Sequence, residues 1–157
     1  MKNIVWTRID DRLIHGQVMT QWIQYTSANE VLIIDDAVAS DSFLQMVMKS
    51  SVPSNIKLTV LSIRESIDYL NGESSGEKII VLVKTPVTLD RLTDTGVILT
   101  SVNVGGIGAR AGRKQLYKNI SVSDDEKSAF EDLLKKNIKV FIRVVTSDTE
   151  EPISKYL

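Results

Sequence analysis

Short apolar runs rich in β-branched residues alternate along the chain with segments of helical periodicity. Residues 31–34 and 79–83 contain no polar residue and are bounded by charges, as expected of strands that are covered on both faces of a sheet. Four further candidate strands cover residues 4–6, 58–61, 97–99 continuing to 102–104, and 140–142 extending to 145. The pattern predicts a mostly parallel sheet.

The segments between these runs carry helix signals. Residues 16–25 predict a helix whose apolar stripe combines Ile14, Val18, Trp22 and Tyr25. Four helix starts have sequence signals: the Ser-Asp cap of residues 41–49, the capping boxes 62–65 and 123–126, and Thr85-Pro86 before a helix that continues to about Thr93 and is ended by Gly96. Alternation of strands and helices therefore predicts an α/β fold, an open, mostly parallel sheet with helices on both faces.

The domain organisation is simple. A length of 157 residues matches one domain of about 150 residues, residues 1–157, and no linker or repeat divides it. Residues 114–121 alternate less cleanly and predict an antiparallel edge or hairpin beside the sheet.

Composition excludes several classes of function. The 19 basic and 20 acidic residues give a net charge of −1, so bulk charge does not favour nucleic-acid binding. Because the chain has no cysteine, it has no disulfide framework, thiolate nucleophile or zinc–thiolate site. No apolar run approaches the ~18 residues that span a bilayer, and we expect a soluble, cytoplasmic protein.

The strongest chemical candidate is the segment that joins the first predicted strand to the first helix. It contains the only histidine, His15, directly before the helix. The carboxyl end of a strand in an open α/β sheet is where ligands bind, and the N–H groups of a helix start favour an anion. The same positive field helps to keep the imidazole neutral and nucleophilic near pH 7.

Four charged residues surround this histidine in the sequence. Arg8 and Arg12 are expected to bind phosphate oxygens through their planar guanidinium groups, and Asp10 or Asp11 to hold those arginines or the second imidazole nitrogen. Nothing in this chemistry requires a metal or another cofactor. The alternative interpretation is a solvated turn in which His15 only caps the helix.

Residues 8–18, Arg-Ile-Asp-Asp-Arg-Leu-Ile-His-Gly-Gln-Val, resemble the signature of the IIB component of the mannose/fructose/sorbose family of bacterial phosphoenolpyruvate-dependent sugar phosphotransferase systems. The resemblance continues through nearly the whole chain, in segments 35–41, 84–86, 102–106, 112–115 and 120–122. That family has a mostly parallel α/β fold.

The resemblance implies a phosphohistidine relay without a cofactor. His15 would accept a phosphoryl group through Nδ1 from the IIA phosphocarrier and donate it to a sugar translocated by the membrane components IIC and IID. The groups implied around it are Arg8, Arg12, Asp10 and the backbone amides of Ile14, Gly16 and Gln17. The implied sugar is a hexose, such as mannose, fructose or sorbose, or an amino sugar, such as N-acetylgalactosamine. The implied location is cytoplasmic, peripheral to the membrane transporter.

Two expectations concern partner contacts. Transfer between proteins requires an accessible His15, and Leu13, Ile14 or Met19 would form a small apolar docking patch around it. Arg110 or Arg113, in the neighbouring glycine-rich loop, would help to recruit the phosphorylated partner, or would be simply solvated.

Other functional classes remain open at this level. A magnesium-dependent receiver-like or phosphatase-like domain would use Asp10/Asp11 and Asp35/Asp36, although the spacing of Lys84 and Pro86 differs from that of a receiver. Residues 106–111 fit a Gly-x-Gly-x-x-Ala dinucleotide fingerprint but predict a loop rather than a helix start. A pure binding module would use the basic residues at 135–139. Acidic residues precede them, so this segment is better interpreted as an ordinary charged helix face.

Overall fold

A seven-stranded sheet forms the centre of the molecule. The structure, a computed structural model, describes residues 1–157. The sheet order is β3-β2-β4-β1-β5-β8-β9, with bounds β1 (Ile4–Asp10), β2 (Glu30–Ile34), β3 (Lys57–Leu61), β4 (Ile79–Val83), β5 (Ser101–Gly106), β8 (Lys139–Ile142) and β9 (Glu151–Pro152). All neighbouring pairs are parallel except β8 and β9. The predicted mostly parallel α/β class is confirmed.

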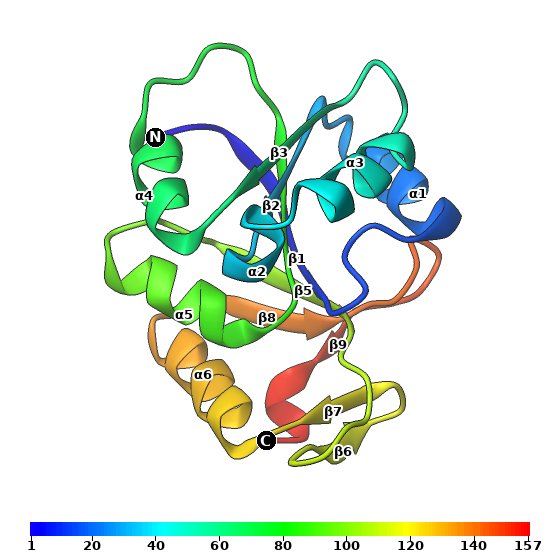
Figure 1. Cartoon of the computed structure of the whole chain (residues 1–157). Helices are drawn as coiled ribbons and strands as arrows, with labels where there is room; N and C mark the ends of the chain where they lie inside the picture. The colour runs from blue at the N-terminus through cyan, green and yellow to red at the C-terminus, as the bar shows by residue number, and fades with distance from the viewer.

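Helices cover both faces of this sheet (Figure 1). One face carries α1 (Gly16–Thr26), α2 (Asp36–Ala39) and α3 (Ser42–Ser50), and the other carries α4 (Ile63–Asn71), α5 (Pro86–Asp94) and α6 (Asp124–Lys135). Two apolar clusters fill the layers, with 12 buried residues on the α1 face and 22 on the α4–α6 face. The short 3-10 turn Ile153–Lys155 closes the chain.

The capping residues begin the helices where the sequence predicts them. Ser62 and Ser123 form complete capping boxes with Glu65 and Glu126, and the Thr85 hydroxyl accepts from the Val87 amide. The hairpin is also confirmed: β6 (Lys114–Tyr117) pairs antiparallel with β7 (Ile120–Val122). No helix combines the length and the apolar character that crossing a bilayer requires.

Two strand predictions were too long. Residues 97–99 are not a strand, because Gly96 turns the chain with φ +94° and β5 begins only at Ser101. Val97 and Leu99 are still buried, which explains the strand-like pattern. The last parallel strand ends at Ile142 rather than at residue 145, and the chain then forms a loop before β9.

The apolar stripe of α1 also differs from the prediction. Its buried residues are Met19, Trp22 and Ile23, whereas Tyr25 is 54% exposed. Tyr25 packs edge-on against Trp22 and lies under the Arg143 guanidinium, 4.8 Å from Cζ to the ring centre. An aromatic side chain at the margin of the stripe thus keeps one edge in solvent.

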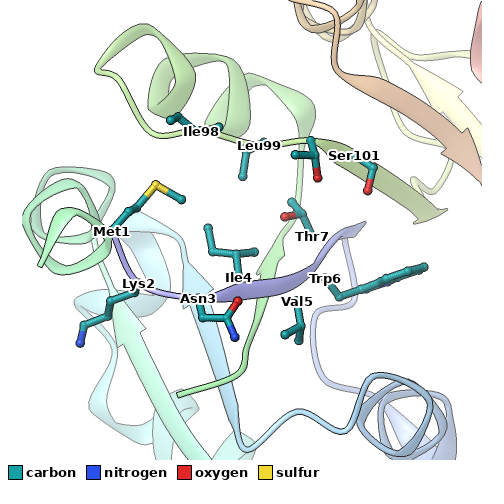
Figure 2. A pocket seen from close by; sticks show the side chains of 11 residues that line it. Met1, Lys2, Asn3, Ile4, Val5, Trp6, Thr7, Ile98, Leu99 and Ser101 are labelled. Atoms are coloured by element: carbon teal, nitrogen blue, oxygen red, sulfur yellow. The ribbon is translucent and has the colours of Figure 1, made fainter. Parts of the chain in front are cut away.

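A cavity of about 210 Å³ opens at the amino end of β1 (Figure 2). It forms because β1 pairs with β5 only from Arg8 onward, so Ile4 to Thr7 lie apart from residues 98–101. His15 follows the opposite, carboxyl end of the same strand. This cavity is therefore separate from the candidate site.

The carboxyl ends of β1 and β5 form a topological switch point. From β1 the chain crosses by α1 to β2, on the β4 side, whereas from β5 it proceeds to β8 on the other side. Diverging connections of this kind open a crevice at the sheet edge, where ligands bind in open α/β folds.

Candidate functional site

The segment between β1 and α1 is a tight turn that places His15 at the start of the helix. The Leu13 amide donates to the Asp10 carbonyl over 2.9 Å, and Leu13 itself has a left-handed φ of +56°. A buried leucine in this conformation is strained, and such strain concentrates at functional sites. Gly16 also has a positive φ, +50°, which only glycine adopts without steric cost.

Asp10 is the centre of the charged cluster. Its fully buried carboxylate accepts from Arg8 Nη2 at 3.2 Å, Arg12 Nε at 3.1 Å and His15 Nε2 at 3.0 Å. Burial opposes ionisation of this group, but the hydrogen bonds from Arg12 and His15 and the charge of Arg8 prevail and lower its pKa. Asp10 is therefore a stable anion that holds both arginines and the imidazole.

His15 presents one ring nitrogen free. Its side chain is 23% exposed, Nε2 is bonded to Asp10, and Nδ1 has no hydrogen-bond partner. His15 is the N-cap of α1 but its side chain caps no amide, whereas α2 to α6 all begin with a side-chain cap. The exposed residues Gly16 and Gln17 thus lie in a first turn whose N–H groups have no partner within the helix, while Ile14 is buried.

Arg8 does not occupy the position that the sequence suggested. Its side chain is fully buried, and its Nη atoms donate to Asp10, the Asn103 amide oxygen and the carbonyls of Arg143 and Val144. Burial lowers the Arg8 pKa to about 10, against the opposing effect of Asp10, so it stays charged at neutral pH. We correct the expectation that Arg8 binds phosphate oxygens: the side chain is fully buried, and both of its Nη atoms donate to protein acceptors, while only the buried Nε has no partner.

Arg12 is in the opposite situation. Its side chain is 52% exposed, and Asp10 holds Nε and Nη2 through the two carboxylate oxygens. The Arg12 guanidinium is therefore oriented yet accessible, as a group that contacts an incoming anion must be.

Asp11, unlike its neighbour Asp10, binds the loop that follows β5. Asp11 accepts from the Gly108 amide at 2.7 Å and from Arg113 Nη1 at 3.3 Å. The buried Arg113 also forms a two-point ion pair with Glu126, 2.8 and 2.9 Å. Arg113 is 4% exposed and cannot recruit a partner directly, which corrects one expectation, whereas Arg110 is exposed.

Leu13, Ile14 and Met19 are all buried in the α1-side core. The expectation that they form an exposed docking patch around His15 is therefore wrong. The apolar character of these positions serves the packing of the turn and of the helix against the sheet.

The second acidic pair works as helix caps. Asp35 accepts from the Val38 amide, and Asp36 accepts from the Ile63 amide at the start of α4. No group of three or more acidic, histidine or cysteine side chains is placed to hold a metal ion. The glycine segment 105–112 leads to β6 and not into a helix, so it lacks the context of a dinucleotide site.

A polar cavity of about 320 Å³ adjoins the Asp11 side of the turn. Its lining residues come from four loops: Asp11, Asp35, Lys84, Thr85, Gly108, Ala109, Arg110 and Arg113.

Sequence reasoning missed the residues beneath the cluster. Asn103 is 1% exposed and contacts Arg8, and Gly105 lies so close to the Arg8 guanidinium that a Cβ there would be 2.1 Å from Cζ. A polar residue within the apolar strand Val102–Val104 was the available signal, because a buried amide requires partners.

Fold and site together define an α/β protein with a histidine at a helix start that is hydrogen-bonded to a buried aspartate. The model of the family "PTS system sorbose subfamily IIB component" matches residues 4–157. The chain belongs to this family of phosphotransferase-system IIB components, whose general role is phosphoryl transfer to a sugar.

Individual relatives cover the chain almost completely. It is 34% identical to the PTS system fructose-specific EIIB component of Bacillus subtilis, over 100% of this chain and 97% of the relative. It is 35% identical to the mannose-specific EIIAB component of Escherichia coli, over 90% of this chain and 44% of that longer protein. The crystal structure of the IIBSor domain of the sorbose permease from Klebsiella pneumoniae superimposes with a TM-score of 0.92 at 31% identity, covering 98% and 95% of the two chains.

Proposed function

We propose that this chain is a phosphocarrier in which His15 accepts a phosphoryl group on Nδ1 and then donates it to a sugar. The donor is the phosphohistidine of a IIA component, and the acceptor is a hexose or an amino sugar, such as N-acetylgalactosamine, mannose, fructose or sorbose, translocated by the membrane components IIC and IID. The chain then works in the cytoplasm, at the surface of that transporter.

The observation that carries the proposal is the 3.0 Å contact of His15 Nε2 with Asp10. A neutral imidazole that donates through Nε2 keeps the lone pair on Nδ1, which is the nucleophilic atom. As Nδ1 bonds to phosphorus, the P–N bond of the donor phosphohistidine breaks and positive charge develops on the His15 ring. The buried Asp10 carboxylate stabilises that charge through the same hydrogen bond.

The surroundings supply the remaining requirements of phosphoryl transfer. The reaction depends mainly on position and on donors for the equatorial oxygens. Arg12 and the first-turn amides of Gly16 and Gln17 are such donors, and the uncapped start of α1 leaves those amides available. In the second transfer a sugar hydroxyl oxygen attacks phosphorus and loses its proton to solvent. The P–Nδ1 bond breaks, and His15 returns to its neutral form with the proton on Nε2.

A labelling experiment tests the proposal. The chain is mixed with labelled phospho-IIA, and the label is expected on His15 as an acid-labile, alkali-stable phosphoramidate. The variant His15→Ala is expected to fold, because the side chain lies outside both core clusters, and to accept no label. Gln24→Ala, on the exposed side of α1, is the matched control and is expected to label normally.

Three results would contradict the phosphocarrier assignment. Label on the His15→Ala variant would place the acceptor elsewhere, and an alkali-labile acyl phosphate would indicate an aspartate. Failure of the folded wild-type chain to label would indicate a binding protein without transfer activity.

A further inference from the structure

Residues of strand β5 pack closely around the buried Arg8 side chain. Asn103 lies directly opposite Arg8 in the β1–β5 register. Its amide oxygen accepts from Arg8 Nη1 at 2.6 Å, and its Nδ2 donates to the Arg143 carbonyl at 2.9 Å. Both halves of this buried amide are therefore paired.

The groups around the Arg8 guanidinium restrict its movement. Gly105, two residues along the same face of β5, has no room for a side chain, since a Cβ would be 2.1 Å from Arg8 Cζ. The Trp22 ring lies 5.1 Å from the same atom, and the carbonyls of Arg143 and Val144 each accept at 3.0 Å. Among these groups Asn103 makes the shortest hydrogen bond to Arg8.

From Arg8 the contacts continue to the reactive ring. Arg8 Nη2 donates to Asp10 Oδ2 at 3.2 Å, and the same oxygen accepts from His15 Nε2 at 3.0 Å. The bond to Asp10 is the only hydrogen bond of the His15 side chain. The orientation and the tautomer of the imidazole thus depend on a carboxylate that is held in place by Arg8 from the buried side and by Arg12 from the exposed side.

We propose that Asn103 is a positioning residue for phosphoryl transfer: through Arg8 and Asp10 it holds His15 with Nε2 protonated and Nδ1 free. The inference rests on the proposed phosphocarrier function. Without the Asn103 oxygen, the Arg8 guanidinium loses its shortest bond and the restraint on Asp10 Oδ2 weakens. The ring then samples other orientations and tautomers, and fewer encounters with the donor are productive.

The test combines kinetics with a spectroscopic readout. For Asn103→Ala we expect the maximal rate of transfer from phospho-IIA to fall about 10- to 100-fold while the KM for phospho-IIA changes less than about threefold. In ¹⁵N spectra of the imidazole, the unphosphorylated wild type is expected to show the Nε2–H tautomer, and the variant a mixture of tautomers. Val102→Ala, on the same strand but facing the other core cluster, is the control for loss of packing and is expected to change neither readout.

A double-variant cycle tests the route through Arg8. In an Arg8→Lys background, the further change Asn103→Ala is expected to lower the transfer rate by no more than about twofold, because the two residues act as one unit. If Asn103→Ala does not fold, Asn103→Ser, which keeps a short donor and acceptor, gives the same comparison with the wild type.

The outcomes separate this inference from the function on which it rests. A folded Asn103 variant with the wild-type transfer rate and the wild-type ¹⁵N spectrum overturns the positioning role, although His15 remains the phosphoryl acceptor. Fully additive effects of Asn103→Ala and Arg8→Lys also overturn it. Absence of label on wild-type His15 overturns the function itself, whereas the tautomer measurement on Asn103→Ala remains interpretable.

Discussion

At the scale of single residues, the two arginines of the charged cluster differ in accessibility. Arg8 and Arg12 are two positions either side of Asp10, and both bind it, but only Arg12 is accessible. The sequence predicted the participants, because a lone histidine before a helix between arginines and aspartates points to anion chemistry. It gave no means of telling which arginine is buried, since that depends on Asn103 and Gly105, almost a hundred residues away.

Arg12 is the residue for which a direct kinetic effect is expected. Replacing it with alanine removes an oriented, accessible guanidinium that can bind a phosphate oxygen, and we expect transfer from phospho-IIA to slow by about 10- to 1000-fold, equivalent to roughly 1.4–4 kcal/mol. Rapid-quench measurement of labelled His15 gives the rate. Arg64→Ala, an exposed arginine on α4, is the control, and equal rates for Arg12→Ala and the control would reduce Arg12 to a structural role.

At the scale of elements, local signals set the boundaries of helices well and those of strands less well. Capping boxes act through adjacent residues, so Ser62 and Ser123 are readable in the sequence. The end of a strand depends on its neighbour: residues 97–99 have a strand-like composition, but Gly96 turns the chain and β5 begins only at Ser101. The short strand β9 carries no periodicity and could not be predicted.

The start of α6 is tied to the glycine-rich loop by the Arg113–Glu126 ion pair, which predicts a pH-dependent stability. Burial raises the pKa of Glu126, but hydrogen bonds from Arg113 and Ser123 and the charge of Arg113 outweigh it, and the net pKa is lowered. The ion pair therefore contributes fully to the free energy of unfolding above the unfolded-state pKa of Glu126, about 4.3. This contribution is lost as the pH falls through the lower pKa of Glu126 in the folded state. Glu126→Gln is therefore expected to lower the free energy of unfolding by about 2 kcal/mol at pH 7 and by progressively less below pH ~4.

Denaturant unfolding between pH 3 and 8 measures this difference. Glutamine at position 126 still completes the capping box, so the comparison isolates the charge. Asp125→Asn, exposed in the same first turn, is the matched control and is expected to cost less than about 1 kcal/mol. The account is contradicted if the difference in free energy of unfolding between the wild type and Glu126→Gln is the same across this pH range.

At the scale of the whole molecule, the sheet order assembles the site. Alternation of strands and helices predicted the fold class, but it could not give the order β3-β2-β4-β1-β5-β8-β9, which places β1 beside β5. That neighbourhood brings the turn bearing His15 against the Asn103–Gly105 segment, and it explains why the buried side of the site was missed. With a net charge of only −1, the overall field of the molecule attracts an anion little, and the proposed binding of a phosphoryl group therefore rests on the local cluster.

The central claim is that Asp10 occupies Nε2 of His15 and leaves Nδ1 to react. The most direct measurement is the ¹⁵N NMR spectrum of the phosphorylated chain with labelled imidazole, in which coupling to phosphorus identifies the bonded nitrogen. The account predicts phosphorus on Nδ1 and a proton on Nε2. Phosphorus on Nε2, or on a residue other than His15, would contradict it.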